Sequence, residues 1–224
     1  MIVLDPRPRP SRALALLSPV IAILLTLVAG GILMALMGKP PLAALQVYFF
    51  QPFVEFWLWL TLPAEEGAMW LYTPAELVVK AIPLALIGTG LAVCFRANVW
   101  NIGAAGQYTA GAILAGWLEL SAPEGASGLM PYLALGVLGG MAWAAILALL
   151  RVRFNANEIL VSLMLTYVAA LLLDWLVRGP LKDPLGFGFP ESKEFQAGFV
   201  MPVLVEGTRL HLGVVLAILA AVVL

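Results

Sequence analysis

Long stretches without a charged side chain dominate this sequence, and they leave few folds open to it. The first stretch, residues 13–38, holds 26 residues with no Asp, Glu, Lys or Arg. As an α-helix it would rise about 39 Å, enough to cross a hydrocarbon core of about 30 Å with some tilt. The later apolar stretches are 77–95, 103–120, 129–150, 159–177 and a shorter one at 210–224. The sequence therefore predicts an all-α, polytopic transmembrane helical bundle with about six spans, the last of them truncated.

Composition excludes the main alternatives to a membrane protein. Hydrophobic residues make up 62% of the chain and charged residues 11%, with a net charge of −1. Soluble domains are about 25% charged, so a soluble enzyme is not expected. The balanced charge offers no basic field for nucleic acid. One cysteine and one histidine exclude an intramolecular disulfide and a Cys/His zinc site. We therefore expect no catalytic residue, no metal site and no bound cofactor in this chain.

The distribution of Lys and Arg predicts the orientation of the spans. Cytoplasmic loops of membrane proteins are rich in these residues. With the N-terminus inside, the short inner segments carry Arg7, Arg9, Arg12, Arg96, Arg151 and Arg153. This arrangement predicts one transmembrane domain over 1–224, with an outer loop at 39–76 and a long outer loop at 178–209.

Two segments leave questions open at this stage. Segment 43–62 is rich in aromatic residues but is interrupted by Pro52 and Glu55, so it is either a short interfacial helix or a further span. A further span would move Arg151 and Arg153 outside, and we favour the interfacial helix for that reason. Segment 210–224 would rise only about 22 Å, which suggests that the chain is the N-terminal part of a longer one.

Polar side chains within the apolar stretches are candidates for function. An amide that faces lipid is costly, so Gln107 should face other helices or a water-filled path. Glu158, Ser162, Thr166 and Asp174 recur at multiples of four residues along one helix. Such a stripe indicates either a lumen or a seam of hydrogen bonds between helices. The stripe begins with Glu158 at a helix start, where the dipole favours an acid and where Asn155 or Asn157 could act as a cap.

Small residues recur with the same spacing and favour close helix packing. One ridge consists of Gly136, Gly140, Ala144 and Ala148, and a second consists of Gly103, Gln107, Gly111 and Ala115. In lipid, helices associate through such smooth surfaces. Packing is the simpler role for these glycines.

Three motifs in the sequence are specific enough to compare with known families. They are FRANVWNIGAAGQ at 95–107, NEILVSLMLTYVAALLLDWLVRGPLKDP at 157–184 and GTRLHLG at 207–213. Together they resemble the branched-chain amino acid, ribose and nucleoside importer superfamily, and most closely its nucleoside or simple-sugar branch. The chain departs from the family at Ala105, where an acid is usual, and this departure leaves substrate preference and coupling open.

The resemblance implies the permease subunit of an ATP-driven importer in the cell (inner) membrane. Such a subunit forms the path for a nucleoside or simple sugar that an extracytoplasmic binding protein delivers. A second permease subunit, identical or related, and separate ATPase subunits that bind ATP complete the assembly. The residues expected to line the path are Asn98, Asn101, Gln107, Thr166 and Tyr167. Those expected to form a coupling or cytoplasmic loop are Arg151, Arg153, Asn157 and Glu158.

Two other functions remain open on the sequence. A branched-chain amino acid permease would need a partner for the substrate carboxylate. Lys80, near the predicted outer end of its span, is the only basic residue within a span, which favours a neutral solute. A non-transport membrane scaffold, from a different class, should show no polar stripe, and this chain has one.

Overall fold

The computed structural model describes residues 11–63 and 68–223, and helices make up most of these ranges. The chain divides into two compact units, Met1–Leu77 and Val78–Leu224. Arg7 and Arg9, which contribute to the predicted orientation, lie outside the described residues.

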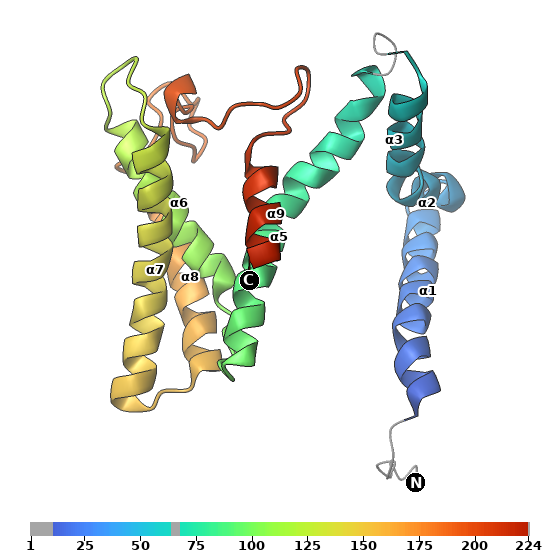
Figure 1. Ribbon diagram of the computed structural model, residues 1–224, viewed down its shortest axis with the longest axis horizontal. Coiled ribbons are helices and arrows are strands. Elements are labelled where there is room, and N and C mark those ends of the chain that lie inside the picture. The colour runs from blue at the N-terminus through green and yellow to red at the C-terminus, as the bar shows by residue number, and fades with distance from the viewer. Residues whose placement is uncertain (1–10, 64–67, 224) are drawn as a thin grey trace. The chain divides into compact units, whose positions relative to one another are not determined.

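The first unit begins with a single long helix, α1 (Arg12–Leu36), drawn in blue in Figure 1. It covers the predicted stretch at 13–38 to within two residues at each end, and it continues through Pro19. The helix ends where Gly38 adopts a left-handed backbone with φ of 70°. The Lys39 N–H then donates to the Met34 carbonyl at 2.9 Å. A glycine in this conformation is the usual way to end a helix, because it has no Cβ to clash.

The aromatic segment at 43–62 forms two short helices rather than one long one. These are α2 (Pro41–Phe49) and α3 (Gln51–Thr61). The chain breaks between them beside Pro52, whose missing N–H cannot continue a helix. The two helices rise about 14 and about 17 Å, so neither is long enough to cross the membrane alone. Glu55 is buried on α3 and accepts a hydrogen bond from the Gln51 amide at 2.7 Å.

The second unit contains most of the remaining helices. A short 3₁₀ turn, η1 (Ala68–Leu71), precedes α5 (Tyr72–Arg96), which runs from the first unit into the second. Then follow α6 (Ala104–Leu120), α7 (Leu129–Phe154), α8 (Glu158–Arg178), the 3₁₀ turn η2 (Ala197–Phe199) and α9 (Gly213–Val223). Helix α6 packs along α7 and against α8, and the three run side by side in Figure 1.

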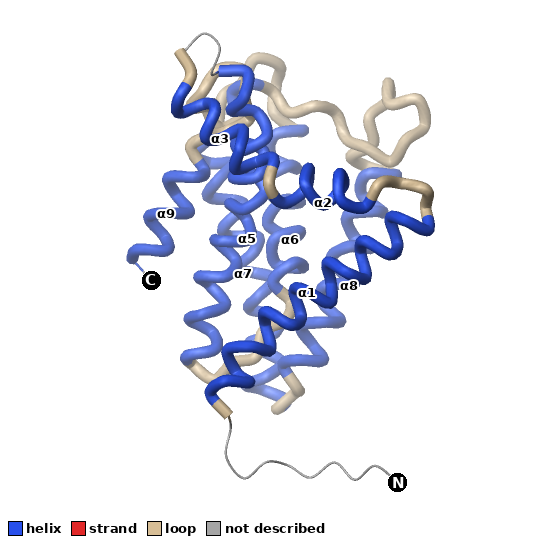
Figure 2. Tube along the Cα trace, turned by 90° about the vertical axis from the view of Figure 1, so that its right-hand side faces the viewer, coloured by secondary structure: helices blue, strands red, loops and turns tan. Residues whose placement is uncertain are grey.

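Within residues 11–63 and 68–223, four helical segments are long and apolar enough to cross a membrane. They are Leu16–Leu36, Met69–Arg96, Leu129–Phe154 and Glu158–Arg178. Helix α6 has 17 residues and rises about 26 Å, at the lower limit for a span. Helix α9 has 11 described residues. Figure 2 shows these helices from the side, with long tan loops at one end. The chain is a multi-pass membrane protein of the predicted all-α class.

Glycines set the close approach of α6 to its two neighbours. A Cβ on Gly111 would meet the Gly136 carbonyl oxygen at 2.5 Å, and a Cβ on Gly139 would meet the Ala110 oxygen at 2.9 Å. On the other side of α6, a Cβ on Gly106 would meet the Thr166 Cα at 2.8 Å. These distances leave no room for a side chain, so the helix backbones touch directly.

Candidate functional site

A groove of about 810 Å³ lies between α5, α6 and α7 of the second unit. One wall comes from α5, through Leu86, Ile87, Gly90, Leu91 and Cys94. The α7 wall includes Tyr132, Leu133, Gly136 and Gly140, and Met201 and His211 approach from the long loop after α8. Ligand sites are commonly concave, mostly apolar and furnished with a few polar groups, and this groove has that character.

The residues that line the groove combine apolar side chains with a few hydrogen-bonding groups. Among the described lining residues there is no Asp, Glu, Lys or Arg. Hydrogen-bonding groups come instead from Asn101, Gln107, Tyr108, Tyr132 and His211. Within the described ranges there is also no group of three or more His, Cys, Asp or Glu side chains that could hold a metal ion. The groove is therefore suited to a neutral molecule that donates and accepts hydrogen bonds.

Gln107 lies on the first turn of α6, where the α6 backbone packs closely against neighbouring helices. Its carbonyl oxygen lies 3.3 Å from the position a Cβ on Gly140 would take. Gln107 is among the residues that line the groove, and its side-chain amide makes no hydrogen bond to another residue in the described ranges. A partly exposed amide held in this way has both its donor and its acceptor available to a ligand.

Asn101 also lines the groove, but one of its atoms has a structural role. The side chain is buried, and its Oδ1 accepts the Gly103 N–H at 2.9 Å. This contact shapes the turn that leads into α6. Next to it, the Ile102 N–H donates to the Ser162 hydroxyl at 3.3 Å and attaches the turn to α8.

Three of the predicted path residues do not line the groove. Asn98 adopts a left-handed backbone with φ of 56° in the turn after α5, and its side chain is exposed. Thr166 faces Gly106 in the seam between α6 and α8, and its hydroxyl donates to the Ser162 carbonyl at 3.1 Å. Tyr167 is exposed on α8. At Ser162 and Thr166, then, the polar stripe of α8 lies in a contact between helices.

Tyr132, Met201 and His211 also line the groove, and none of them is among the predicted path residues, although His211 lies within the GTRLHLG motif. The Tyr132 ring contacts both Phe195 and Phe199 edge to face, at centroid distances of 6.0 and 6.2 Å. The nitrogen Nδ1 of His211 accepts the Gly213 N–H at 3.1 Å, so the neutral ring carries its proton on Nε2. An isolated antiparallel bridge joins Val203 to His211, which lies within the GTRLHLG motif.

The long loop after α8 is fixed to the ends of α6 and α7 beside the groove. A carboxylate oxygen of Glu119 accepts the Gln196 N–H at 2.8 Å, and the Gln196 side chain accepts the Gly125 N–H at 2.9 Å. The Gly128 N–H donates to the Gly198 carbonyl at 3.1 Å. Since the same loop supplies Met201 and His211, these contacts hold one border of the groove in place.

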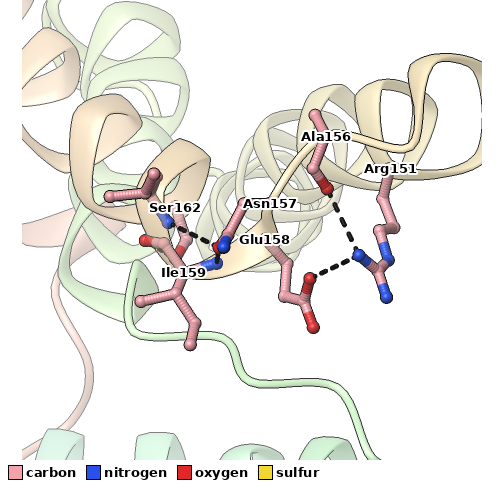
Figure 3. A network of polar contacts seen from close by, with 7 residues as sticks. Arg151, Ala156, Asn157, Glu158, Ile159 and Ser162 are labelled. Atoms are coloured by element: carbon pink, nitrogen blue, oxygen red, sulfur yellow. Dashed lines mark hydrogen bonds and ion pairs between the residues drawn. The ribbon is translucent and has the colours of Figure 1, made fainter.

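The predicted coupling residues form the turn between α7 and α8, shown in Figure 3. Arg151 pairs with Glu158 at 2.8 Å and also donates to the Ala156 carbonyl at 3.4 Å. The Asn157 side chain accepts the Ile159 and Leu160 N–H groups, and so caps α8 as the sequence suggests. Arg153 is exposed in the last turn of α7.

Comparison with known proteins agrees with this architecture. Residues 73–224 match the family described as "Branched-chain amino acid transport system / permease component". The glucose ABC transporter permease protein of Haloferax volcanii is 34% identical over 202 residues, covering 90% of this chain and 49% of its own. The guanosine ABC transporter permease protein of Bacillus subtilis is 30% identical over 215 residues, covering 93% of this chain and 56% of its own.

A nucleoside ABC transporter permease protein of Lactococcus lactis is more distant, at 25% identity over 154 residues, covering 63% of this chain and 42% of its own. The chain thus spans about half the length of the curated relatives it matches. No solved structure matches it significantly. The family match covers about two thirds of the chain and includes every helix that borders the groove. The chain belongs to the permease component family of the branched-chain amino acid transport system.

Proposed function

We propose that this chain is part of the permease subunit of an ATP-driven importer for a nucleoside or simple sugar. The groove between α5, α6 and α7 forms part of the membrane path for that solute. The proposal rests on one observation above all: the groove carries hydrogen-bonding groups but no Asp, Glu, Lys or Arg among its described lining residues.

Physical chemistry connects such a lining to a neutral, hydroxylated solute. A sugar or nucleoside loses hydrogen bonds to water when it enters an apolar membrane, and the path must replace them. The Gln107 amide, without a partner among the described residues, supplies both a donor and an acceptor. Tyr108 and Tyr132 add hydroxyl groups and ring faces. None of these groups needs to carry charge to bind such a solute.

An amino acid substrate fits this lining less well. Its carboxylate and ammonium groups are both charged at neutral pH, and burying them without charged or dipolar partners is costly. The groove offers no Lys or Arg side chain for the carboxylate among the residues described. The family name includes branched-chain amino acids, but the lining favours the solutes named for the glucose and guanosine relatives.

The assembly proposed around this chain has three further components. Separate ATPase subunits bind and hydrolyse ATP on the inner side, and a second permease subunit, identical or related, completes the path. An extracytoplasmic binding protein delivers the solute to the outer loops. This chain then contributes the path and part of the coupling, and it hydrolyses nothing itself.

Uptake by the reconstituted assembly tests the proposal. The intact protein is purified in mild detergent with whatever ATPase accompanies it and placed in proteoliposomes with its binding protein. Uptake of labelled guanosine, glucose and leucine is then measured with ATP and, as a control, with a non-hydrolysable analogue. We expect ATP-dependent uptake of guanosine or glucose. Uptake of leucine alone would favour the amino acid permease, and no ATP-dependent uptake of any solute, with no ATPase recovered, would favour a scaffold.

A further inference from the structure

The loop after α8 contains a short closed segment, residues 183–191, which we call the 183–191 loop. Its two ends are joined because the Asp183 N–H donates to the Glu191 carbonyl at 2.8 Å. Inside it, Asp183 Oδ1 accepts the Leu185 N–H at 2.9 Å, and the Phe189 N–H donates to the Gly186 carbonyl at 2.8 Å. Backbone hydrogen bonds therefore give this loop a defined shape.

The shape presents three large apolar side chains outward, which we call the apolar tip. Leu185 is 83% exposed, Phe187 is 99% exposed and Phe189 is 68% exposed. Phe187 also adopts a left-handed backbone, with φ of 43°. A bulky side chain rarely takes this conformation, and such strain persists where the surrounding structure imposes it. Apolar side chains held out in this way are stabilised when another surface removes them from water.

We propose that the apolar tip inserts into the headgroup layer of the lipid bilayer beside α8. The first reason is the short connection to a membrane helix. α8 ends at Arg178 and the 183–191 loop begins at Asp183, so the connecting chain reaches at most about 17 Å. The Leu181 N–H still donates to the Leu176 carbonyl at 2.9 Å, which keeps the connection close to the helix.

The second reason is continuity with the outward face of α8. Trp175 lies in the last turn of α8 and is 61% exposed, and Leu171, one turn earlier, is 70% exposed. Exposed Trp side chains at the ends of membrane helices favour the headgroup level. The apolar tip begins at Leu185, ten residues after Trp175 along the chain. A bilayer that surrounds α8 would therefore contact Trp175 and the apolar tip together.

Fluorescence of a probe at the tip tests the proposal in lipid alone. The intact protein, with Cys94 and any other native cysteine replaced by Ala, carries Phe187→Cys labelled with an environment-sensitive NBD group. A matched protein carries the label at Lys193→Cys, an exposed position just outside the 183–191 loop. Both are placed in nanodiscs of phosphatidylcholine and phosphatidylglycerol, with and without lipids that bear a nitroxide near the headgroup.

We expect the label at position 187 to emit at shorter wavelength and to be quenched more strongly by the nitroxide lipid than the label at 193, with no other protein present. Equal emission and equal quenching at the two positions would overturn the proposal. A blue shift at 187 that appears only after an extracytoplasmic binding protein is added would also overturn it, and would assign the tip to protein docking. The same measurement at Leu185→Cys gives an independent result if replacing Phe187 prevents folding.

Discussion

Glu119 and Gln196 lie 77 positions apart in the sequence, and a carboxylate oxygen of Glu119 accepts the Gln196 backbone N–H at 2.8 Å. The Glu119 side chain is 1% exposed, and its other oxygen, Oε2, has no hydrogen-bond partner among the described residues. The contact joins the end of α6 to the long loop that supplies Met201 and His211 to the groove.

Replacing this carboxylate should release the loop. In Glu119→Ala the Gln196 N–H loses its acceptor, at a cost of about 1–3 kcal/mol. Hydrogen exchange at Gln196 should then become about tenfold faster or more, by the same free-energy scale. Glu124→Ala is the control, since Glu124 is an exposed acid on the connection after α6. Unchanged exchange at Gln196 in Glu119→Ala would show that other contacts hold the loop.

The contact between α6 and α7 should not tolerate a methyl group at Gly111. The added Cβ would meet the Gly136 carbonyl oxygen at 2.5 Å, so one backbone must move. Overpacking of this kind costs about 1–3 kcal/mol, and Gly111→Ala should lower the melting temperature measured by fluorescence-detected gel filtration. Gly88→Ala on α5 is the control, because a Cβ there meets nothing within 4 Å. Equal melting of the two variants would contradict the close approach of these helices.

Glu158 stabilises the turn between α7 and α8, and it should contribute little to assembly or uptake. The Glu158 side chain is 13% exposed, but that of its partner Arg151 is 49% exposed, and a pair open to water on one side is worth about 0–1 kcal/mol. Glu158→Gln should therefore assemble normally and retain most uptake, measured beside Arg153→Gln, which removes an exposed cation from the same region. If Glu158→Gln assembles but loses uptake, the residue takes part in coupling to the ATPase.

The sequence predicted the helices well because an apolar stretch in lipid must satisfy its own backbone hydrogen bonds, and an α-helix does so within one segment. The stretch at 129–150 corresponds to α7 (Leu129–Phe154), which extends four residues further at its C-terminal end. The stretch at 159–177 corresponds to α8 (Glu158–Arg178), which is one residue longer at each end. The predicted stretch begins five residues after the start of α5 at Tyr72, because the charged Glu76 marks the boundary of the apolar stretch. The break between α2 and α3 lies beside Pro52, one of the two residues at which the sequence already indicated an interruption.

The candidate site was predicted only in part. Asn101 and Gln107 are among the residues predicted to line the path, and both line the groove. The spacing of Thr166 shows which side of α8 it occupies, but spacing does not tell whether a lumen or another helix covers that side. Tyr132, Met201 and His211 reach the groove through tertiary contacts, chiefly those of Glu119, Phe195 and Phe199, which no local pattern records.

The most direct test of the central claim compares Gln107→Leu with Thr109→Val in the reconstituted uptake assay. Both changes remove polar atoms from α6, but Gln107 lines the groove, whereas the Thr109 hydroxyl donates to the Ala105 carbonyl at 2.9 Å within the helix. We predict that Gln107→Leu inserts and assembles normally but takes up nucleoside or sugar about tenfold more slowly, because a hydrogen bond to the solute is lost. Thr109→Val should transport as the unmodified protein does. Normal uptake by an assembled Gln107→Leu protein would contradict the assignment of this groove as the solute path.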